Sequence, residues 1–304
     1  MSEPLISFEP ATGEELWRGP VSDVDAEVEI ARRAWPEWAA KPVTFRTETL
    51  RRFVDRVKAE GEALADLIAR ETGKPLWEAR TEVESVANKV NISVTAYAER
   101  TPNRRIEGAM GLRNAVRHKP HGALAVLGPY NFPAHLPNGH IVPALIAGNS
   151  VLFKPSEKTP AVGAKLVELF HSAGVPQEVL RLVIGGPETG KALAGHEGID
   201  GLLFTGSART GLALNRQFAG QPGKMLALEM GGNNPIVVWD TADIRTAAVL
   251  VAQSAFLSAG QRCSNARRLI VRDSLADKLI EEVRDLANRL IVDHPHADPA
   301  PYMG

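Results

Sequence analysis

Cysteine is nearly absent from this chain, since its 304 residues include only Cys263. A single thiol excludes an internal disulfide framework, so Cys263 is either inert filling or a reactive group. Taken alone, a free cysteine is more often buried filling. The choice between the two therefore depends on the residues around it.

An excess of either charge is also missing. Lys plus Arg number 35 and Asp plus Glu number 36, which gives a formal net charge of -1. This balance does not favour a nucleic-acid partner. The polar segment 1–20 lacks the apolar stretch that a signal peptide or a membrane span requires. We therefore expect a cytoplasmic protein without a membrane partner.

The pattern of apolar residues predicts an α/β fold. Residues 1–100 read as helices, with apolar positions at helical spacing between Leu50 and Ile68, and residues 103–121 look like an extended excursion. From Ala123 onward, short apolar runs alternate with helical patterns, which indicates βαβ units and a Rossmann-type parallel sheet. The strands predicted for this sheet, each buried on both faces, are 123–127, 150–153, 180–184, 201–204 and 225–228.

A second group of elements follows this sheet. The pattern predicts a strand over 235–239, a helix over 244–259, a strand over 269–271 and an amphipathic helix over 274–290. The length of the chain favours two domains over one. We expect a dinucleotide-binding domain over 1–228 and a catalytic α/β domain over 229–304, incomplete at its C-terminus.

Two glycine-rich turns follow predicted strands. Segment 185–192 matches a phosphate-binding P-loop except at Ala192, where a Ser or Thr hydroxyl would hold magnesium, and Pro187 removes one N–H donor. A plain strand-to-helix turn is the better interpretation. Segment 204–211 also joins a strand to a helix, so its N–H groups would face an anion such as a pyrophosphate. Turn chemistry alone explains its glycines about equally well.

Cys263 stands in a setting that an inert core cysteine does not need. It follows a predicted helix and Gly260, and it is next to Arg262, whose charge favours the thiolate. Upstream, Glu229 ends a buried strand just before flexible glycines, where it could also be an ordinary turn carboxylate. A carboxylate and a thiol brought together at strand ends would be a general base and a nucleophile.

Two further strand ends carry polar groups. Asn131 lies in a loop held by two prolines, where its amide could donate to an oxyanion, although a rigid turn is the simpler interpretation. Lys154 and Glu157 close the next strand, at the carboxyl edge where open α/β sheets bind ligands. Each feature is ambiguous separately, whereas together they point to one site.

These motifs resemble the aldehyde dehydrogenase superfamily over essentially the whole chain. The segments that carry the resemblance, in the order and spacing of that family, are 129–133, 154–157, 204–207, 228–232 and 260–263. A closer likeness is to the branch that oxidises N-succinylglutamate 5-semialdehyde in the bacterial arginine succinyltransferase pathway. This closer likeness is carried by segments 131–149, 227–235 and 253–268.

The resemblance implies a role for each motif. Cys263 would attack the aldehyde, the Asn131 amide would hold the oxyanion, and Glu229 would activate the water that hydrolyses the thioester. NAD would be the cofactor, because a carboxylate at Glu157 would repel the 2′-phosphate of NADP. A homo-oligomer is expected for the full-length form, and no metal. The residues implied to contact NAD are Lys154, Glu157, Gly206, Ser207, Ala208, Arg209, Thr210 and Gly211.

The sequence departs from the family pattern in three respects. Members of the family are longer, so we expect a C-terminally truncated chain that lacks the later Glu-Xaa-Phe-Gly-Pro motif. Within the closer likeness, Ala134 stands where glycine is expected, and Ser264 and Asn265 stand where Thr and Cys are expected. Three alternatives therefore stay open: another semialdehyde or aldehyde dehydrogenase, a P-loop nucleotide-binding protein, or a non-catalytic fragment.

Overall fold

The centre of the molecule is a parallel sheet of five strands. The structure is a computed structural model that describes residues 3–304. The strands lie in the order β7-β6-β5-β8-β9, so the predicted parallel sheet is confirmed. Their bounds are β5 Ala123–Leu127, β6 Ser150–Lys154, β7 Leu180–Leu182, β8 Gly201–Gly206 and β9 Met225–Met230.

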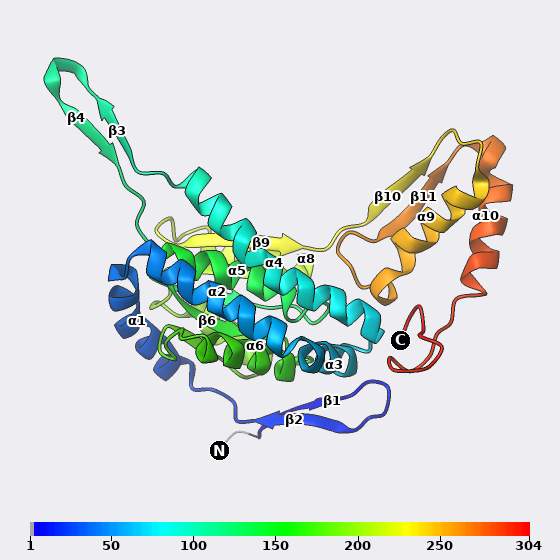
Figure 1. Ribbon diagram of the computed structural model, residues 1–304, viewed down its shortest axis with the longest axis horizontal. Helices are drawn as coiled ribbons and strands as arrows, with labels where there is room; N and C mark the ends of the chain where they lie inside the picture. Colours follow the sequence, from blue (N-terminus) through cyan, green and yellow to red (C-terminus); the bar gives the residue numbers. More distant parts are fainter. Residues whose placement is uncertain (1–2) are drawn as a thin grey trace.

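Helices cover both faces of this sheet, which explains why its inner strands β5, β6 and β8 are mainly apolar (Figure 1). Along β5, Leu124 and Val126 pack into one core, while Ala123 and Ala125 pack into the other. No helix within residues 3–304 combines the length and the apolar character needed to cross a bilayer. The helices over the first face are α2 Val43–Ala59, α3 Gly61–Thr72, α4 Leu76–Arg100, α5 His135–Ala147 and α6 Pro160–Ser172, and those over the second are α1 Val24–Ala40, α7 Pro187–Gly195 and α8 Ala208–Phe218.

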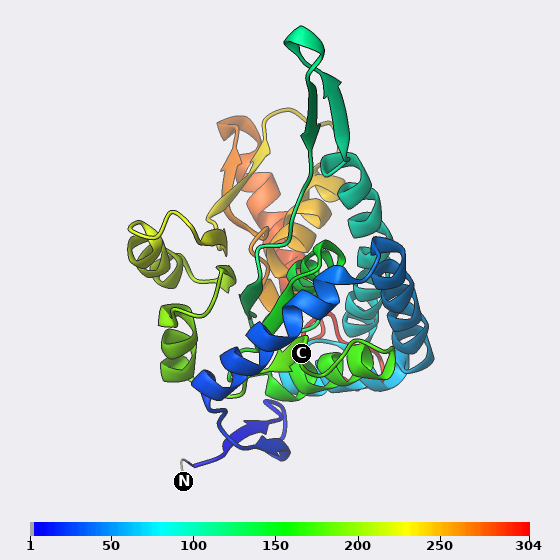
Figure 2. The ribbon, with the colours of Figure 1, turned by 90° about the vertical axis from the view of Figure 1, so that its left-hand side faces the viewer.

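Two hairpins lie outside the sheet. The predicted excursion over 103–121 is confirmed as an antiparallel pair, β3 (Arg104–Glu107) and β4 (Arg113–Val116), joined by the short turn η1 (Ala109–Gly111). This hairpin extends away from the body of the molecule in both views (Figures 1 and 2).

The prediction that residues 1–100 are helical throughout is wrong near the N-terminus. There, β1 (Leu5–Phe8) and β2 (Glu15–Gly19) form a second antiparallel hairpin. The turn between them includes Gly13 at φ 76°, a left-handed conformation that glycine adopts without strain. Residues 1–2 of this prediction lie outside the described part of the chain.

The last part of the chain forms a smaller α/β unit at one end of the molecule (Figure 1). Its strands β10 (Asn234–Val238) and β11 (Ala266–Val271) pair in parallel, and α9 (Ile244–Phe256) and α10 (Asp273–Ala287) pack together beside them. The helix predicted to reach residue 259 stops earlier and continues as the short turn η2 (Leu257–Gly260). The division after residue 228 stays a prediction, and β9 continues past it to Met230.

Candidate active site

A cavity of about 1110 Å³ lies at the carboxyl ends of the parallel strands. Leu127 on β5 pairs with Lys154 on β6 and with Phe204 on β8, and Phe204 pairs with Leu228 on β9. This register brings the loops that follow these strands to the same edge of the sheet. The predicted site residues that line the cavity are Asn131, Lys154, Glu157, Gly206, Ser207, Arg209, Thr210, Glu229 and Cys263.

Two predicted cofactor residues, Ala208 and Gly211, are not part of the lining. Gly211 is buried where α8 packs on β9. A Cβ atom at this position would lie 2.4 Å from the sulfur of Met230, closer than van der Waals contact allows. Close packing of helix on strand therefore accounts for this glycine.

The backbone before Cys263 is strained. Ser258, Ala259 and Gly260 follow one another at φ 56°, 52° and 69°. For the two residues that carry side chains, this left-handed conformation costs on the order of 1 kcal/mol each. The strained turn follows α9 and leads into Cys263, whose side chain is exposed rather than buried in the core.

Side-chain amides hold the cysteine loop in place. Asn265 is buried; its carbonyl oxygen accepts from the Arg262 backbone N–H, and its amide donates to the carbonyl oxygen of Ser254 at 2.8 Å. Asn234 donates to the carbonyl oxygen of Cys263 at 2.6 Å. Asn265 is one of the departures from the expected family pattern, and the structure assigns it an anchoring role that sequence motifs did not reveal.

Asn131 lies directly against the cysteine loop. Its side-chain amide donates to the carbonyl oxygen of Gln261 at 2.6 Å. The loop after β5 and the loop that carries Cys263 are therefore joined, although they are far apart in sequence. A primary amide has two N–H groups, so Asn131 keeps one for a ligand.

Glu229 reaches the same cavity from β9. Its side chain is exposed, and the strand ends one residue later at Met230. The thiol, the amide and the carboxylate predicted as catalytic groups thus line one cavity from two loops and the end of strand β9. This arrangement can present a nucleophile, a hydrogen-bond donor and a proton acceptor to one bound molecule.

Lys154 and Glu157 form a charged pair at the end of β6. The ammonium of Lys154 is nearly buried, donates to the Pro155 carbonyl oxygen at 2.9 Å and lies 3.8 Å from a carboxylate oxygen of Glu157. Burial lowers the pKa of Lys154, while the charge of Glu157 opposes that shift. Glu157 remains partly exposed, so its carboxylate is available to a ligand.

The two glycine-rich turns take the predicted strand-to-helix form. In the first, α7 begins at Pro187 with Gly186 at its N-cap. In the second, Ser207 caps α8, because its hydroxyl accepts from the backbone N–H of Thr210 at 3.2 Å. The N-terminus of α8 therefore belongs to the cavity wall, where its dipole favours an anion.

Three basic residues of the cavity wall were missed by motif reading. Lys89 on α4 lies near His135 and His140 on α5, since its charge acts on both rings. His140 is 3.1 Å from the hydroxyl of Thr205, and burial, with a smaller effect of Lys89, lowers its pKa to about 4. The available signal was a pair of histidines, His135 and His140, in a helix that is otherwise mainly apolar.

Known proteins match the whole chain. The model of the aldehyde dehydrogenase family matches residues 2–304. The chain is 92% identical over 304 residues to N-succinylglutamate 5-semialdehyde dehydrogenase of Sphingopyxis alaskensis, and 63% identical over 300 residues to the protein of the same name from Novosphingobium aromaticivorans. These alignments cover 100% and 99% of this chain but only 63% and 64% of the two relatives.

Solved structures agree with this match. NADP-dependent glyceraldehyde-3-phosphate dehydrogenase from Bacillus halodurans, complexed with NADP, has a TM-score of 0.91 at 30% identity; the match covers 99% of this chain and 64% of that one. Betaine aldehyde dehydrogenase from Staphylococcus aureus, in complex with NAD+, has a TM-score of 0.92 at 26% identity, with 98% and 62% covered. From the fold, the grouping of motifs in one cavity and the family match over residues 2–304, we conclude that this chain belongs to the aldehyde dehydrogenase family.

Proposed function

We propose that the protein oxidises N-succinylglutamate 5-semialdehyde to N-succinylglutamate with NAD. The observation that carries this proposal is the convergence of Cys263, Asn131 and Glu229 on one cavity of a chain that is 92% identical to a relative of that name. Because the chain spans 63% of that relative, the activity of the whole protein is part of the proposal.

In this proposal Cys263 attacks the aldehyde carbon as a thiolate. The Asn131 amide and the backbone N–H of Cys263 hold the oxyanion of the thiohemiacetal. NAD, when bound, supplies the hydride acceptor. Loss of hydride leaves an acyl thioester on Cys263, and Glu229 takes a proton from the water that hydrolyses it. The products are the carboxylic acid and the free thiol.

The cavity wall suits a dinucleotide. The N-terminus of α8 offers backbone N–H groups to a pyrophosphate, with Gly206, Ser207, Arg209 and Thr210 in the lining. Complexes of the structural relatives include both NAD+ and NADP, so our choice of NAD rests on Glu157. Its carboxylate can accept a hydrogen bond from a ribose 2′-hydroxyl and would repel a 2′-phosphate.

The substrate choice has support on the α4–α5 wall. N-succinylglutamate 5-semialdehyde carries two carboxylates, and Lys89 lines the cavity on that wall. Within residues 3–304, no carboxylate lies within ion-pair distance of Lys89. We infer that Lys89 binds one substrate carboxylate, which an uncharged aldehyde would not offer.

The test is NADH formation by protein expressed from its complete reading frame. We expect turnover of N-succinylglutamate 5-semialdehyde to be faster, at low substrate concentration, than that of hexanal or glyceraldehyde 3-phosphate. Lys89→Met should raise KM for the succinylated substrate and leave KM for hexanal unchanged. Preference for another aldehyde would overturn the substrate assignment, and a fold that NAD does not stabilise against heat would contradict the cofactor assignment.

We also propose that the chain divides after residue 228 into an NAD-binding domain, which contributes Asn131 to the site, and a catalytic domain that carries Glu229 and Cys263. The second point of this proposal is that the protein forms a homo-oligomer. The hairpin β3–β4 supports the second point, because it exposes Ile106, Met110 and Leu112 to solvent. Light scattering on the purified protein tests the proposed homo-oligomer. A monomer at micromolar concentration would contradict it.

A further inference from the structure

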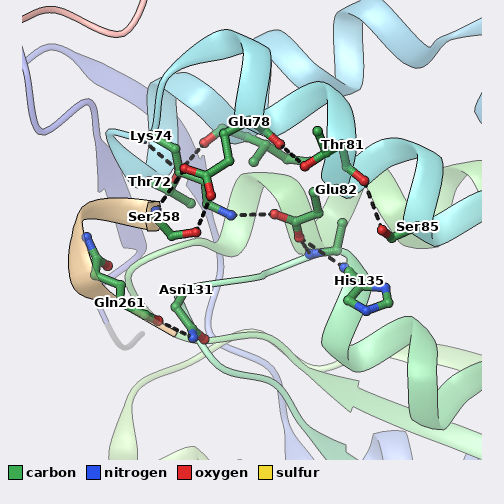
Figure 3. A network of polar contacts seen from close by, with 12 residues as sticks. Thr72, Lys74, Glu78, Thr81, Glu82, Ser85, Asn131, His135, Ser258 and Gln261 are labelled. Atoms are coloured by element: carbon green, nitrogen blue, oxygen red, sulfur yellow. Dashed lines mark hydrogen bonds and ion pairs between the residues drawn. The ribbon is translucent and has the colours of Figure 1, made fainter. Parts of the chain in front are cut away.

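Helix α4 carries a buried carboxylate that contacts the strained turn before Cys263. The side chain of Glu78 is fully buried and accepts a backbone hydrogen bond from Ser258 at 3.0 Å. It also accepts from the Ser258 hydroxyl and from the Arg262 guanidinium, whose Nε donates to the same hydroxyl at 2.8 Å. Figure 3 shows Glu78 directed at Ser258 from α4. One carboxylate thus holds both ends of the segment 258–262.

A second carboxylate on the same face of α4 holds the loop after Asn131. Glu82 lies one helical turn from Glu78 and accepts from the backbone N–H groups of Ala134 and His135, each at 3.0 Å. The ammonium of Lys74 neutralises Glu82 at 2.6 Å. The bond from Asn131 to Gln261 then closes a ring of contacts that starts and ends on α4 (Figure 3).

The turn at Ser258 and Ala259 needs such support. Both residues have positive φ, which L-residues adopt only when surrounding contacts impose it. Among residues 3–304, the contacts of the Ser258 hydroxyl are those to Glu78 and Arg262. Without the Glu78 carboxylate, the buried backbone N–H of Ser258 would lose its partner. The Ser258 hydroxyl would lose its acceptor and Arg262 its ion-pair partner, and only the bond between these two side chains would remain. The segment would then relax and move Cys263 relative to Asn131.

We propose that Glu78 is a positioning residue, which holds the Cys263 loop at the distance from Asn131 that oxyanion binding requires. Glu78 lies outside the cavity lining, so it acts through the turn and through Arg262. Its pairing with Arg262 also keeps that positive charge directed toward α4. The catalytic consequence rests on the proposed function, whereas the geometric role does not.

The single cysteine permits a direct test. The rate of iodoacetamide alkylation of Cys263 is measured for the parent, for Glu78→Gln and for the control Glu71→Gln, with each rate corrected for the unfolded fraction from a urea melt. We expect Glu78→Gln to react about three- to tenfold faster, because the loop loosens and the charge of Arg262 is released toward the thiol.

Glu71 is a matched control on the neighbouring helix α3. It is also buried, and it accepts from a hydroxyl (Ser7) and from the backbone N–H groups of Ala161 and Val162 at 2.9 and 2.8 Å. Its loss should lower stability but leave the alkylation rate within about twofold of the parent. Equal alkylation rates in the two variants would overturn the proposal.

Turnover provides a second test, in which Glu78→Gln should be slower than the parent rather than faster. With the aldehyde substrate, Glu78→Gln should lower kcat about tenfold or more while KM for NAD stays unchanged, and Glu78→Asp should recover part of the loss. If Glu78→Gln does not fold, Ser258→Ala should also speed alkylation, by a smaller factor, and an unchanged rate in that variant would overturn the proposal. Alkylation needs neither aldehyde nor NAD, so an enzyme that oxidises no aldehyde would contradict the proposed function alone.

Discussion

The two sides of the cavity are built in different ways. On the dinucleotide side, Lys154, Glu157 and Ser207 stand where a regular strand ends and a turn or helix follows, and their backbone is held by the sheet and by local caps. On the nucleophile side, Cys263 lies in irregular backbone, which Glu78, Asn131 and Asn265 hold by side-chain hydrogen bonds.

This contrast predicts different responses to substitution. The backbone hydrogen bonds of a sheet or helix survive the loss of one side chain. Single substitutions on the dinucleotide side should therefore have small effects on stability and activity. When a buried polar side chain is removed, several backbone groups lose their hydrogen-bond partners. Single substitutions on the nucleophile side should therefore have large effects on stability and activity.

Cys263→Ala should lower aldehyde turnover by roughly four orders of magnitude or more, because the proposed covalent intermediate forms on this thiol. Steady-state NADH formation measures the effect, with the neighbouring exposed Ser264→Ala as the control. Substantial activity in Cys263→Ala would remove the thiol from the mechanism.

Asn265→Ala should lower the free energy of unfolding by about 2–4 kcal/mol, because a buried amide that bonds Arg262, Ser254 and Ala255 is lost. On the dinucleotide side, Ser207→Ala removes one helix cap and should cost only about 1 kcal/mol. Urea unfolding of both variants measures the difference. Similar losses in the two would break the contrast between the regions.

His140 should make stability depend on pH. Its folded-state pKa of about 4 lies below its ordinary value of 6.5, so the folded protein keeps this ring neutral while the unfolded chain binds a proton. The neutral ring therefore contributes about 3 kcal/mol to the free energy of unfolding above pH 6.5. This contribution is lost as the pH falls toward 4. Urea melts of the parent and of His140→Gln between pH 8 and pH 5 should diverge below pH 6.5, and parallel curves would exclude this role for His140.

Glu157→Ala should lower the ratio of kcat/KM with NAD to kcat/KM with NADP by about tenfold or less. The effect should be this small because the carboxylate is partly exposed and its charge is screened by solvent. The value of kcat with NAD should stay nearly unchanged. The ratio of kcat/KM for the two cofactors measures it. A parent enzyme that prefers NADP would contradict the role given to Glu157.

Sequence patterns predicted the regular part of the molecule well. The strand predicted over 123–127 agrees with β5 at both ends, and the other four strands of the sheet are present. The inner strands β5, β6 and β8 are buried on both faces, so their mainly apolar composition reflects their environment, whereas β7 and β9 at the two edges are mostly only partly buried. The N-terminal hairpin was missed because its short strands are only partly buried and have no continuous apolar run.

Strand burial and short motifs are local properties, so the sequence alone specified the parallel sheet, the family and the motif residues of the cavity, but not its residues Lys89, His135 and His140. Tertiary structure alone decided that Glu78 meets Ser258, that Glu82 meets the start of α5 and that Asn265 anchors the cysteine loop. No local pattern marks a buried carboxylate that neutralises a distant residue, since its partner is chosen by the packing of α4 against two loops. The reactive part of the site is therefore specified by long-range polar contacts that form only when the chain is folded.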